Sequence, residues 1–297
     1  MSTESNINYS QYSFSEALSE VIDGLTRPPP EKISTGLRDL DSVLSGGLPR
    51  VGVSAVAGRP SVGHEEFARH VAFSAARQGH GVLYFSLQRP RREIVLRGLA
   101  EALDIDTGSL NSPAHKYDAL DLLEDRAAEI TRLSTLPILI DDTPSLSPAE
   151  LCNRAAASCR SRFFSGTPAR LLIIDSLACL IAGDTVNADR VKPLMIMLNE
   201  LAKNVGIHIL CTASVQKQVE ERAYCEPRLF DLWGDGMVER FCDPVLAIHR
   251  DSYYRPANSI SDSESAQIIV LRNSQSSRGP VAVSALFNSR GFSDLIA

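Results

Sequence analysis

The chain has 297 residues, 44% hydrophobic and 22% charged, a composition typical of a soluble globular protein and unlike that of a disordered or fibrous one. It has no run of about 18 apolar residues, and its N-terminus has neither a basic start nor an apolar core, so we expect no membrane contact and no secretory signal. The net charge of −6 gives no chain-wide attraction to nucleic acid, and six cysteines without a C-x-x-C pair favour a reduced, cytoplasmic protein over a disulfide framework or a zinc site.

Residues 1–32 are predicted to form a separate N-terminal segment. Residues 1–11 are polar, whereas Phe14–Leu25 carries apolar side chains at helical spacing and is predicted to be an amphipathic helix. Three consecutive prolines at positions 28–30 follow it and form a stiff tether. A helix of this length is marginal alone in water, so its apolar face must dock on the rest of the chain or on another subunit.

Residues 33–297 are predicted to form one α/β domain. Short apolar runs alternate with segments of helical periodicity, a pattern typical of a mostly parallel sheet between helices. After about residue 245 the apolar runs follow one another directly, so we expect hairpins added to one edge of the sheet. The predicted strands are Val51–Ala57, Gly81–Leu87, Pro137–Ile140, Leu171–Ile174, Ile207–Thr212, Val245–Ile248, Ala266–Leu271 and Val281–Phe287, and the predicted helices span about 65–78, 91–103, 117–133, 148–162 and 190–205.

A glycine-containing loop separates the first predicted strand from a helix. Such a loop can bind phosphate, because its main-chain N–H groups converge and the helix dipole adds partial positive charge. The full motif, G-x-x-x-x-G-K-[ST], supplies a lysine for the terminal phosphates and a hydroxyl for magnesium. The candidate nucleotide-binding residues are Gly58, Arg59, Pro60, Ser61, Val62, Gly63, His64 and Glu65.

The two positions that carry the chemistry of this motif are changed. His64 stands at the lysine position, and an imidazole of ordinary pKa is mostly neutral at pH 7. Glu65 stands at the hydroxyl position, and Glu65 and Glu66 compete with phosphate for the helix N-terminus. These changes favour a loop that no longer supports phosphoryl transfer over one that retains nucleotide binding.

Asp175 directly follows the apolar run Leu171–Ile174. A carboxylate at the C-terminal end of a strand can hold magnesium through water, although it can also serve as a turn or helix-capping residue. We therefore take Asp175 as the candidate metal ligand. ATP and magnesium are the expected cofactors only if nucleotide binding is retained.

Three arginines, Arg89, Arg91 and Arg92, cluster at the start of the helix predicted over 91–103. The helix dipole disfavours cations at this end. We interpret the cluster mainly as a solvated turn, and a binding surface for an anionic partner is the alternative.

Taken together, these motifs resemble the C-terminal RecA-like domain of DnaB-type replicative helicases, members of superfamily 4. The resemblance begins at about Ile33 and implies a RecA-like P-loop NTPase fold. It also implies that Phe14–Leu25 resembles the family's linker helix, which packs on the neighbouring subunit of a hexameric ring. The matching pieces are Ile33–Asp41, Gly58–Gly63, Phe85–Leu87, Asp141–Pro144, Leu171–Asp175 and Arg250–Tyr254, of which Asp141–Pro144 and Arg250–Tyr254 are the more specific to DnaB.

The departures from the family pattern fall on residues that carry chemistry. Gln88 stands where the family has its catalytic glutamate, and a glutamine cannot accept a proton from the attacking water. The resemblance makes Arg272 and Arg278 the candidates for the family's lysine and arginine finger. Trp233 replaces an arginine of a DNA-contacting loop, so it is a weak candidate for DNA binding by base stacking.

These losses together predict a DnaB-like helicase-domain paralogue that acts as a pseudo-ATPase in DNA replication or recombination. Its partner is expected to be a RecA-like subunit, either a second copy or a DnaB-type helicase, contacted through Phe14–Leu25. One alternative is a divergent but active ATP-dependent DNA helicase. A second alternative is a relative of the RecA/RadA recombination ATPases, which share the Ser-Thr-Gly entry after Ile33.

Overall fold

The chain separates into two compact units, Met1–Glu31 and Lys32–Ala297. In the first unit, α1 is a helix over Phe14–Leu25, the range predicted from its periodicity, and its apolar side chains are exposed. Ser13 caps this helix, because its hydroxyl accepts the N–H of Glu16 while the Glu16 carboxylate accepts the N–H of Ser13. The computed structural model describes residues 13–25, 31–111, 121, 123–181, 187–254, 265–274, 280–288 and 291–295.

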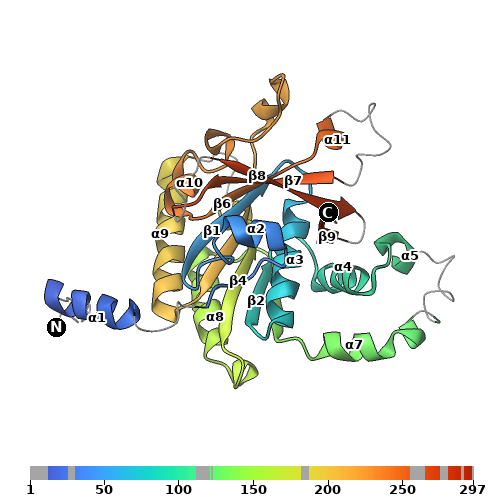
Figure 1. Ribbon diagram of the computed structural model, residues 1–297, viewed down its shortest axis with the longest axis horizontal. Coiled ribbons are helices and arrows are strands. Elements are labelled where there is room, and N and C mark those ends of the chain that lie inside the picture. Colours follow the sequence, from blue (N-terminus) through green and yellow to red (C-terminus); the bar gives the residue numbers. More distant parts are fainter. Residues whose placement is uncertain are drawn as a thin grey trace. The chain divides into compact units, whose positions relative to one another are not determined.

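One sheet forms the centre of the second unit (Figure 1). Its described strands are β1 (Gly52–Gly58), β2 (Gly81–Ser86), β3 (Ile138–Asp141), β4 (Ala169–Asp175), β5 (His208–Ser214), β6 (Val245–His249), β7 (Ser265–Arg272), β8 (Val281–Asn288) and β9 (Gly291–Asp294). They lie in the order β3-β2-β4-β5-β1-β6-β7-β8-β9. The neighbours from β3 to β6 pair in parallel, and β6 to β9 pair antiparallel. Both the mostly parallel α/β fold and the hairpins at one edge, predicted from sequence, are confirmed.

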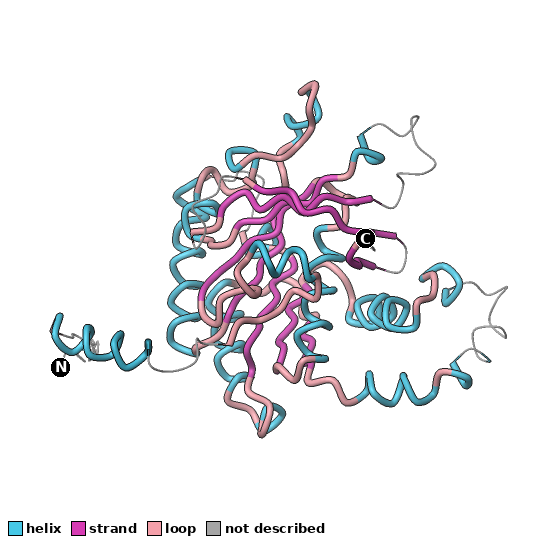
Figure 2. Tube along the Cα trace, viewed as in Figure 1, coloured by secondary structure: helices cyan, strands magenta, loops and turns pink. Residues whose placement is uncertain are grey.

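Helices cover both faces of this sheet (Figure 2). Because successive strand residues point to opposite faces, Ala55 packs in one core with α8 (Pro148–Cys159) and α9 (Ala188–Val205). Val56 packs in a second core with α2 (Arg38–Val43) and α3 (His64–Arg77). No helix of the described residues is long and apolar enough to span a membrane. The described helices of this unit are α2 (Arg38–Val43), α3 (His64–Arg77), α4 (Arg91–Leu103), α5 (Thr107–Asn111), α7 (Ala127–Ser134), α8 (Pro148–Cys159), α9 (Ala188–Val205), α10 (Met237–Phe241) and α11 (Asp251–Tyr254), with short 3-10 turns at 162–164, 177–180, 217–221 and 229–231.

The ends of the helices follow from local chemistry. The hydroxyl of Ser147 accepts the N–H of Glu150, the carboxylate of Glu150 accepts the N–H of Ser147, and Pro148 occupies the first turn of α8. Gly206 ends α9 in the left-handed region, with φ of 74°. Serine before proline and glycine after the last apolar turn are signals that the sequence alone displays.

Several elements differ from the sequence prediction. The short strand β9 was not predicted, because four residues with a single large apolar side chain, Phe292, show no clear alternation. The helices α2, α5, α10 and α11 were not predicted either, because each is too short to show helical periodicity. Of the helix predicted over 117–133, residues 121 and 123–125 are helical, a turn follows at Arg126 and α7 starts at Ala127, while residues 117–120 and 122 lie outside the described residues.

Candidate nucleotide site

The candidate site lies where the central parallel strands end. Gly58, the last residue of β1, is in register with Ser214 at the end of β5, and Ser86 of β2 is in register with Asp175 of β4. In open α/β sheets, ligands bind outside the carboxyl ends of the strands. The glycine loop and Asp175, both singled out from the sequence, therefore lie at the same functional edge of the sheet.

The glycine loop, residues 58–63, runs directly into α3. Gly63 has φ of 110°, and a β-carbon there would lie 2.8 Å from the ring of Phe287, which packs over the glycine. A β-carbon at Gly58 would lie 2.5 Å from Val62 and 2.7 Å from Nδ1 of His64. A larger residue at either position would clash with these side chains, so both positions require glycine.

The remaining loop residues hold its shape. Arg59 donates from Nη1 to the main-chain oxygen of Val215 at 2.9 Å and from Nε to Glu220 at 2.7 Å, which ties the loop to the segment after β5. Ser61, which follows Pro60, has φ of 67°, and the N–H of Val62 closes a turn onto the carbonyl of Arg59 at 3.2 Å. The loop retains a defined conformation even though its chemical residues differ from the phosphate-binding motif.

The side chain of His64, at the lysine position, is folded inward. It is only 6% exposed, and its Nδ1 has no hydrogen-bond partner among the described residues. Burial lowers the pKa of His64 below its usual value, and the charges of Glu65 and Glu66 offset this only in part. The imidazole therefore adds no positive charge for a phosphate, in agreement with the neutral histidine expected from sequence.

The carboxylate of Glu65 is paired with an arginine from the segment between β2 and α4. Arg89 donates to Glu65 Oε2 from Nη2 at 2.7 Å and from Nε at 3.1 Å, and it donates to Glu93 at 2.5 Å. Burial opposes the charge of Arg89, but its two carboxylate partners outweigh burial and raise its pKa. The interpretation as a solvated turn is therefore wrong for Arg89, whereas Arg91 is largely exposed.

Asp175 is buried at the end of β4. Its Oδ1 accepts a hydrogen bond from the Thr212 hydroxyl at 2.7 Å, and its Oδ2 accepts one from the Tyr84 hydroxyl at 3.3 Å. Burial, followed by the negative charge of Glu65, raises the pKa of Asp175 to about 6 despite these two hydrogen bonds. An ionised carboxylate at this position is therefore held at a cost in free energy, a property common at functional sites.

Gln88, at the position of the catalytic glutamate, lies beside the end of β4. Its Nε2 donates to the hydroxyl of Ser176 at 2.9 Å, so the amide is used as a hydrogen-bond donor. An amide has no basic atom that could take a proton from water at neutral pH. In the structure Gln88 contacts Ser176, the residue after Asp175, and makes a structural contact there instead of acting as a base.

One of the two arginine candidates, Arg272, lies away from the loop. Arg272 is in register with Val245, the first residue of β6, and donates to the main-chain oxygen of Glu239 at 2.5 Å. Within one subunit the structure therefore does not bring Arg272 to the glycine loop, which follows the last residue of β1. The other finger candidate, Arg278, lies outside the described residues.

Trp233 anchors the loop that follows β5. Its main-chain N–H donates to the carbonyl of Ser214 at 2.8 Å, and its half-buried ring packs on the core that includes α9. This packing explains a tryptophan at this position without any DNA contact.

The residues present do not fit a magnesium triphosphate. The first turn of α3 offers a buried neutral imidazole and a carboxylate in place of an ammonium group and a hydroxyl. Two unit charges of the same sign about 4 Å apart repel by about 1 kcal/mol in water and by several times more at a half-buried site. The charge of Glu65 therefore opposes the phosphates that the loop geometry would otherwise accept.

Sequence reasoning missed three side chains that shape the site: Tyr84, Thr212 and Phe287. Tyr84 and Thr212 lie on strands predicted to be fully apolar, where a hydroxyl is easily overlooked. Phe287 lies on β8, more than 220 residues beyond Gly63, and nothing local to either residue indicates their contact. A polar residue in an otherwise apolar central strand was the one signal available.

Comparison with known proteins identifies the family of the chain. The model of the DnaB-like helicase C terminal domain family matches residues 32–294. A probable replicative DNA helicase of Trieres chinensis is 29% identical over 90% of this chain and 58% of its own length. A replicative DNA helicase DnaB of Rickettsia felis is 31% identical over 75% of this chain and 46% of its own length, so the chain spans about half the length of these relatives.

Solved structures show the same fold. One solved ATPase domain superimposes with a TM-score of 0.82 at 23% identity, over 97% of this chain and all of that one. A DnaB-like replicative helicase studied with primase gives a TM-score of 0.80 at 21% identity, over 97% of this chain and 68% of that one. The fold, a sheet between two layers of helices with a loop-to-helix turn at its functional edge, is therefore RecA-like, and the chain belongs to the DnaB-like helicase C-terminal domain family.

Proposed function

We propose that this chain is a DnaB-like helicase domain that has lost ATP hydrolysis and acts in DNA replication or recombination through contact with another RecA-like subunit. The observation that carries the proposal is the state of the first turn of α3. There His64 is buried and neutral, and Glu65 is already bound by Arg89. Membership of the DnaB-like family favours this function over the alternative of a recombination ATPase.

The chemistry of phosphoryl transfer explains why these losses matter together. Catalysis of this reaction depends on placed positive charge and on a group that orients or deprotonates water. His64, Glu65 and Gln88 supply neither. Each missing group costs several kcal/mol of transition-state stabilisation, so the combined loss removes useful turnover.

The test is magnesium-dependent ATP turnover by the purified chain, with a replicative DnaB helicase assayed in parallel as the positive control. We expect a rate indistinguishable from the protein-free background, with or without single-stranded DNA. Turnover on the order of 1 per second would establish the alternative, a divergent active helicase. An alanine variant of Asp175 that abolished such turnover would show that the activity belongs to this site and not to a contaminant.

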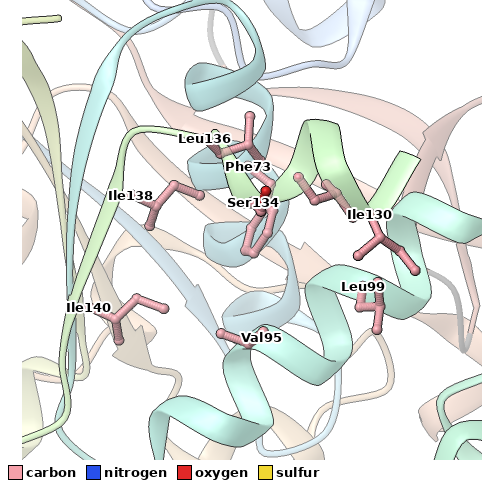
Figure 3. A pocket seen from close by; sticks show the side chains of 9 residues that line it. Phe73, Val95, Leu99, Ile130, Ser134, Leu136, Ile138 and Ile140 are labelled. Carbon is pink, nitrogen blue, oxygen red and sulfur yellow. The ribbon is translucent and has the colours of Figure 1, made fainter. Parts of the chain in front are cut away.

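The partner contact is proposed to join α1 to a groove of a second RecA-like subunit. The groove lies between α4 and α7 against β3, encloses about 350 Å³ and is almost wholly apolar (Figure 3). Val95 of α4 is 51% exposed there, although its neighbours are apolar. Side chains lining the groove are Phe73, Val95, Leu99, Ile130, Leu133, Ser134, Leu136, Ile138 and Ile140.

The helix and the groove complement each other in chemistry. An amphipathic helix binds a groove through apolar side chains spaced three and four residues apart, and α1 presents Phe14, Leu18, Val21, Ile22 and Leu25. Charge adds little to this match, because Arg126, which precedes α7, and Arg132 of α7 lie beside the acidic Glu124, Asp125 and Glu129. The proposed contact therefore rests on the apolar side chains of the helix and of the groove.

Light scattering on the full chain and on a variant lacking residues 1–27 tests the contact. We expect the deletion to lower the apparent mass, or to abolish co-purification with a DnaB helicase, while the body stays folded. Val95→Glu in the groove should have the same effect, and Ile196→Glu, on the half-exposed face of α9, is the matched control. A truncated chain that melts at a much lower temperature with unchanged mass would instead show that α1 belongs to its own body.

A further inference from the structure

A network of five charged residues links the start of α3 to α4. Glu65 and Glu66 belong to the first turn of α3, Arg89 precedes α4, and Glu93 and Arg97 lie on α4. Arg89 binds Glu65 and Glu93, while Arg97 binds Glu66 at 3.0 Å and Glu93 at 2.9 Å. We call these five residues the carboxylate clamp. The clamp joins the first turn of α3, which directly follows the glycine loop, to the first two turns of α4 and the residue before them.

The clamp places carboxylates where a phosphate would otherwise bind. A helix N-terminus favours negative charge, so Glu65 and Glu66 are stabilised there by the dipole of α3. The side chain of Glu65 is only 20% exposed and that of Glu66 only 18%, so both need counter-charges nearby. Arg89 and Arg97 provide those charges from within the chain.

The segment between β2 and α4, which holds Arg89, is also bound to the end of β4. Gln88, directly before Arg89, donates to Ser176, the residue after Asp175. The hydroxyl of Ser86 donates to the main-chain oxygen of Arg89 at 2.7 Å. The glycine-loop helix, the segment after β2 and the end of β4 are therefore held together by side chains, with Arg89 at the meeting point.

We propose that Arg89 takes the place of a bound metal–nucleotide. It joins the start of α3, the segment after β2 and the end of β4, so that a side chain of the protein itself fills the site and the site keeps its geometry without nucleotide. This inference rests on the proposed function, in which the loop no longer hydrolyses ATP. Arg89 acts by holding these three segments in place, and it is therefore a positioning residue. The clamp makes the fold of the site independent of nucleotide, whereas Glu65 also keeps phosphate out.

Thermal unfolding of single and double variants tests the structural half of the proposal. Arg89→Met leaves Glu65 without its partner, and we expect its melting temperature to fall by about 4 °C. Arg91→Met is the matched control, because Arg91 lies in the same segment but is 73% exposed and pairs with Asp142 at the surface, so its melting temperature should stay within about 1 °C of that of the unaltered chain. The double variant Glu65→Gln/Arg89→Met should lose less than the sum of the two single variants, which is the signature of a direct pair.

Nucleotide binding tests the second part of the proposal, that Glu65 keeps phosphate out. A purely structural role of Glu65 and Arg89 would leave nucleotide affinity unchanged. The probe is a fluorescent ATP analogue, titrated without magnesium so that Arg89 supplies the positive charge. Glu65→Thr frees Arg89 from one of its two carboxylate partners and removes one negative charge, so binding should enter the measurable range. Glu65→Thr/Arg89→Met should take it out of that range again, while magnesium-ATP should leave the melting temperature of the unaltered chain unchanged.

Equal melting temperatures of the Arg89→Met and Arg91→Met variants would overturn the proposal. So would equal binding by Glu65→Thr and by Glu65→Thr/Arg89→Met, or a rise of several degrees in the melting temperature of the unaltered chain on adding magnesium-ATP. Failure of the proposed function shows separately, as ATP turnover. The two ideas are thus distinguished by different measurements.

Discussion

Replacing Asp175 by asparagine should make this protein more stable at neutral pH. Burial, with the charge of Glu65, raises the pKa of Asp175 from 3.8 to about 6. In this pH range the folded chain binds more protons at Asp175 than the unfolded chain does, so this group's contribution to stability falls as the pH rises from about 4 to 6. The shift of about 2 pKa units corresponds to a loss of about 3 kcal/mol, fully developed above pH 6 and absent below pH 4.

An asparagine keeps the shape of the side chain and removes the charge. Its carbonyl oxygen can accept from Thr212, and its amide can donate to the hydroxyl of Tyr84, so both contacts of Asp175 have a counterpart. The expected result is a stability advantage of Asp175→Asn that grows by about 3 kcal/mol between pH 4 and pH 7.5. A packing cost of the amide that does not depend on pH lowers the stability of the variant equally at every pH, so it leaves this growth unchanged.

Urea unfolding at several pH values measures the effect, with EDTA present to exclude metal binding. Trp233, the single tryptophan, serves as the fluorescence probe, and circular dichroism checks two-state behaviour. Asp142→Asn is the matched control of opposite sign, because hydrogen bonds from the N–H and side chain of Arg91 lower the pKa of Asp142. A difference between Asp175→Asn and the unaltered chain that does not change with pH would refute the reasoning, since burial would then not penalise the charge.

Two further changes have defined outcomes. His64→Lys with Glu65→Thr should improve affinity for a fluorescent ATP analogue in a titration with magnesium, while turnover in a phosphate-release assay stays low because Gln88 remains; if the folded variant binds no better, the loop no longer accepts phosphate. Ser147→Ala removes the cap of α8 and should cost about 1 kcal/mol in urea unfolding. An effect as small as that of Ser134→Ala, at the exposed end of α7, would contradict the capping role.

The order of strands and helices was predictable because periodicity and turn chemistry are local. The run Leu171–Ile174 is apolar throughout and the run Gly81–Leu87 is mostly apolar, as expected of strands covered on both faces, and Gly206 marks the end of α9. The edge of the sheet that carries the site was predictable for the same reason, since Gly58 and Asp175 both end apolar runs. Parallel strands bring such ends together whatever the connections between them.

The internal ligation of the site was beyond local reasoning. Arg89 and Glu93 are only four residues apart in sequence, so their pairing is a local contact, although Arg89 itself precedes α4. Glu65 is 24 residues from Arg89, and only the packing of α3 beside α4 brings the two together. The sequence indicates that the charges of Glu65 and Glu66 oppose phosphate, but it gives no sign that Arg97 neutralises them, and it favours a solvated turn for Arg89.

The two outer strands of the sheet bear on what kinds of assembly this protein can form. β3 and β9 have four residues each, and β3 starts directly after a proline. Outer strands this short present few free main-chain groups to an extended segment of another molecule, which guards against edge-to-edge pairing and fibre growth. In the contact proposed above, association beside β3 rests on the packing of side chains of α1 in the groove, and the number of copies that assemble would be set by how many such grooves and helices can be matched.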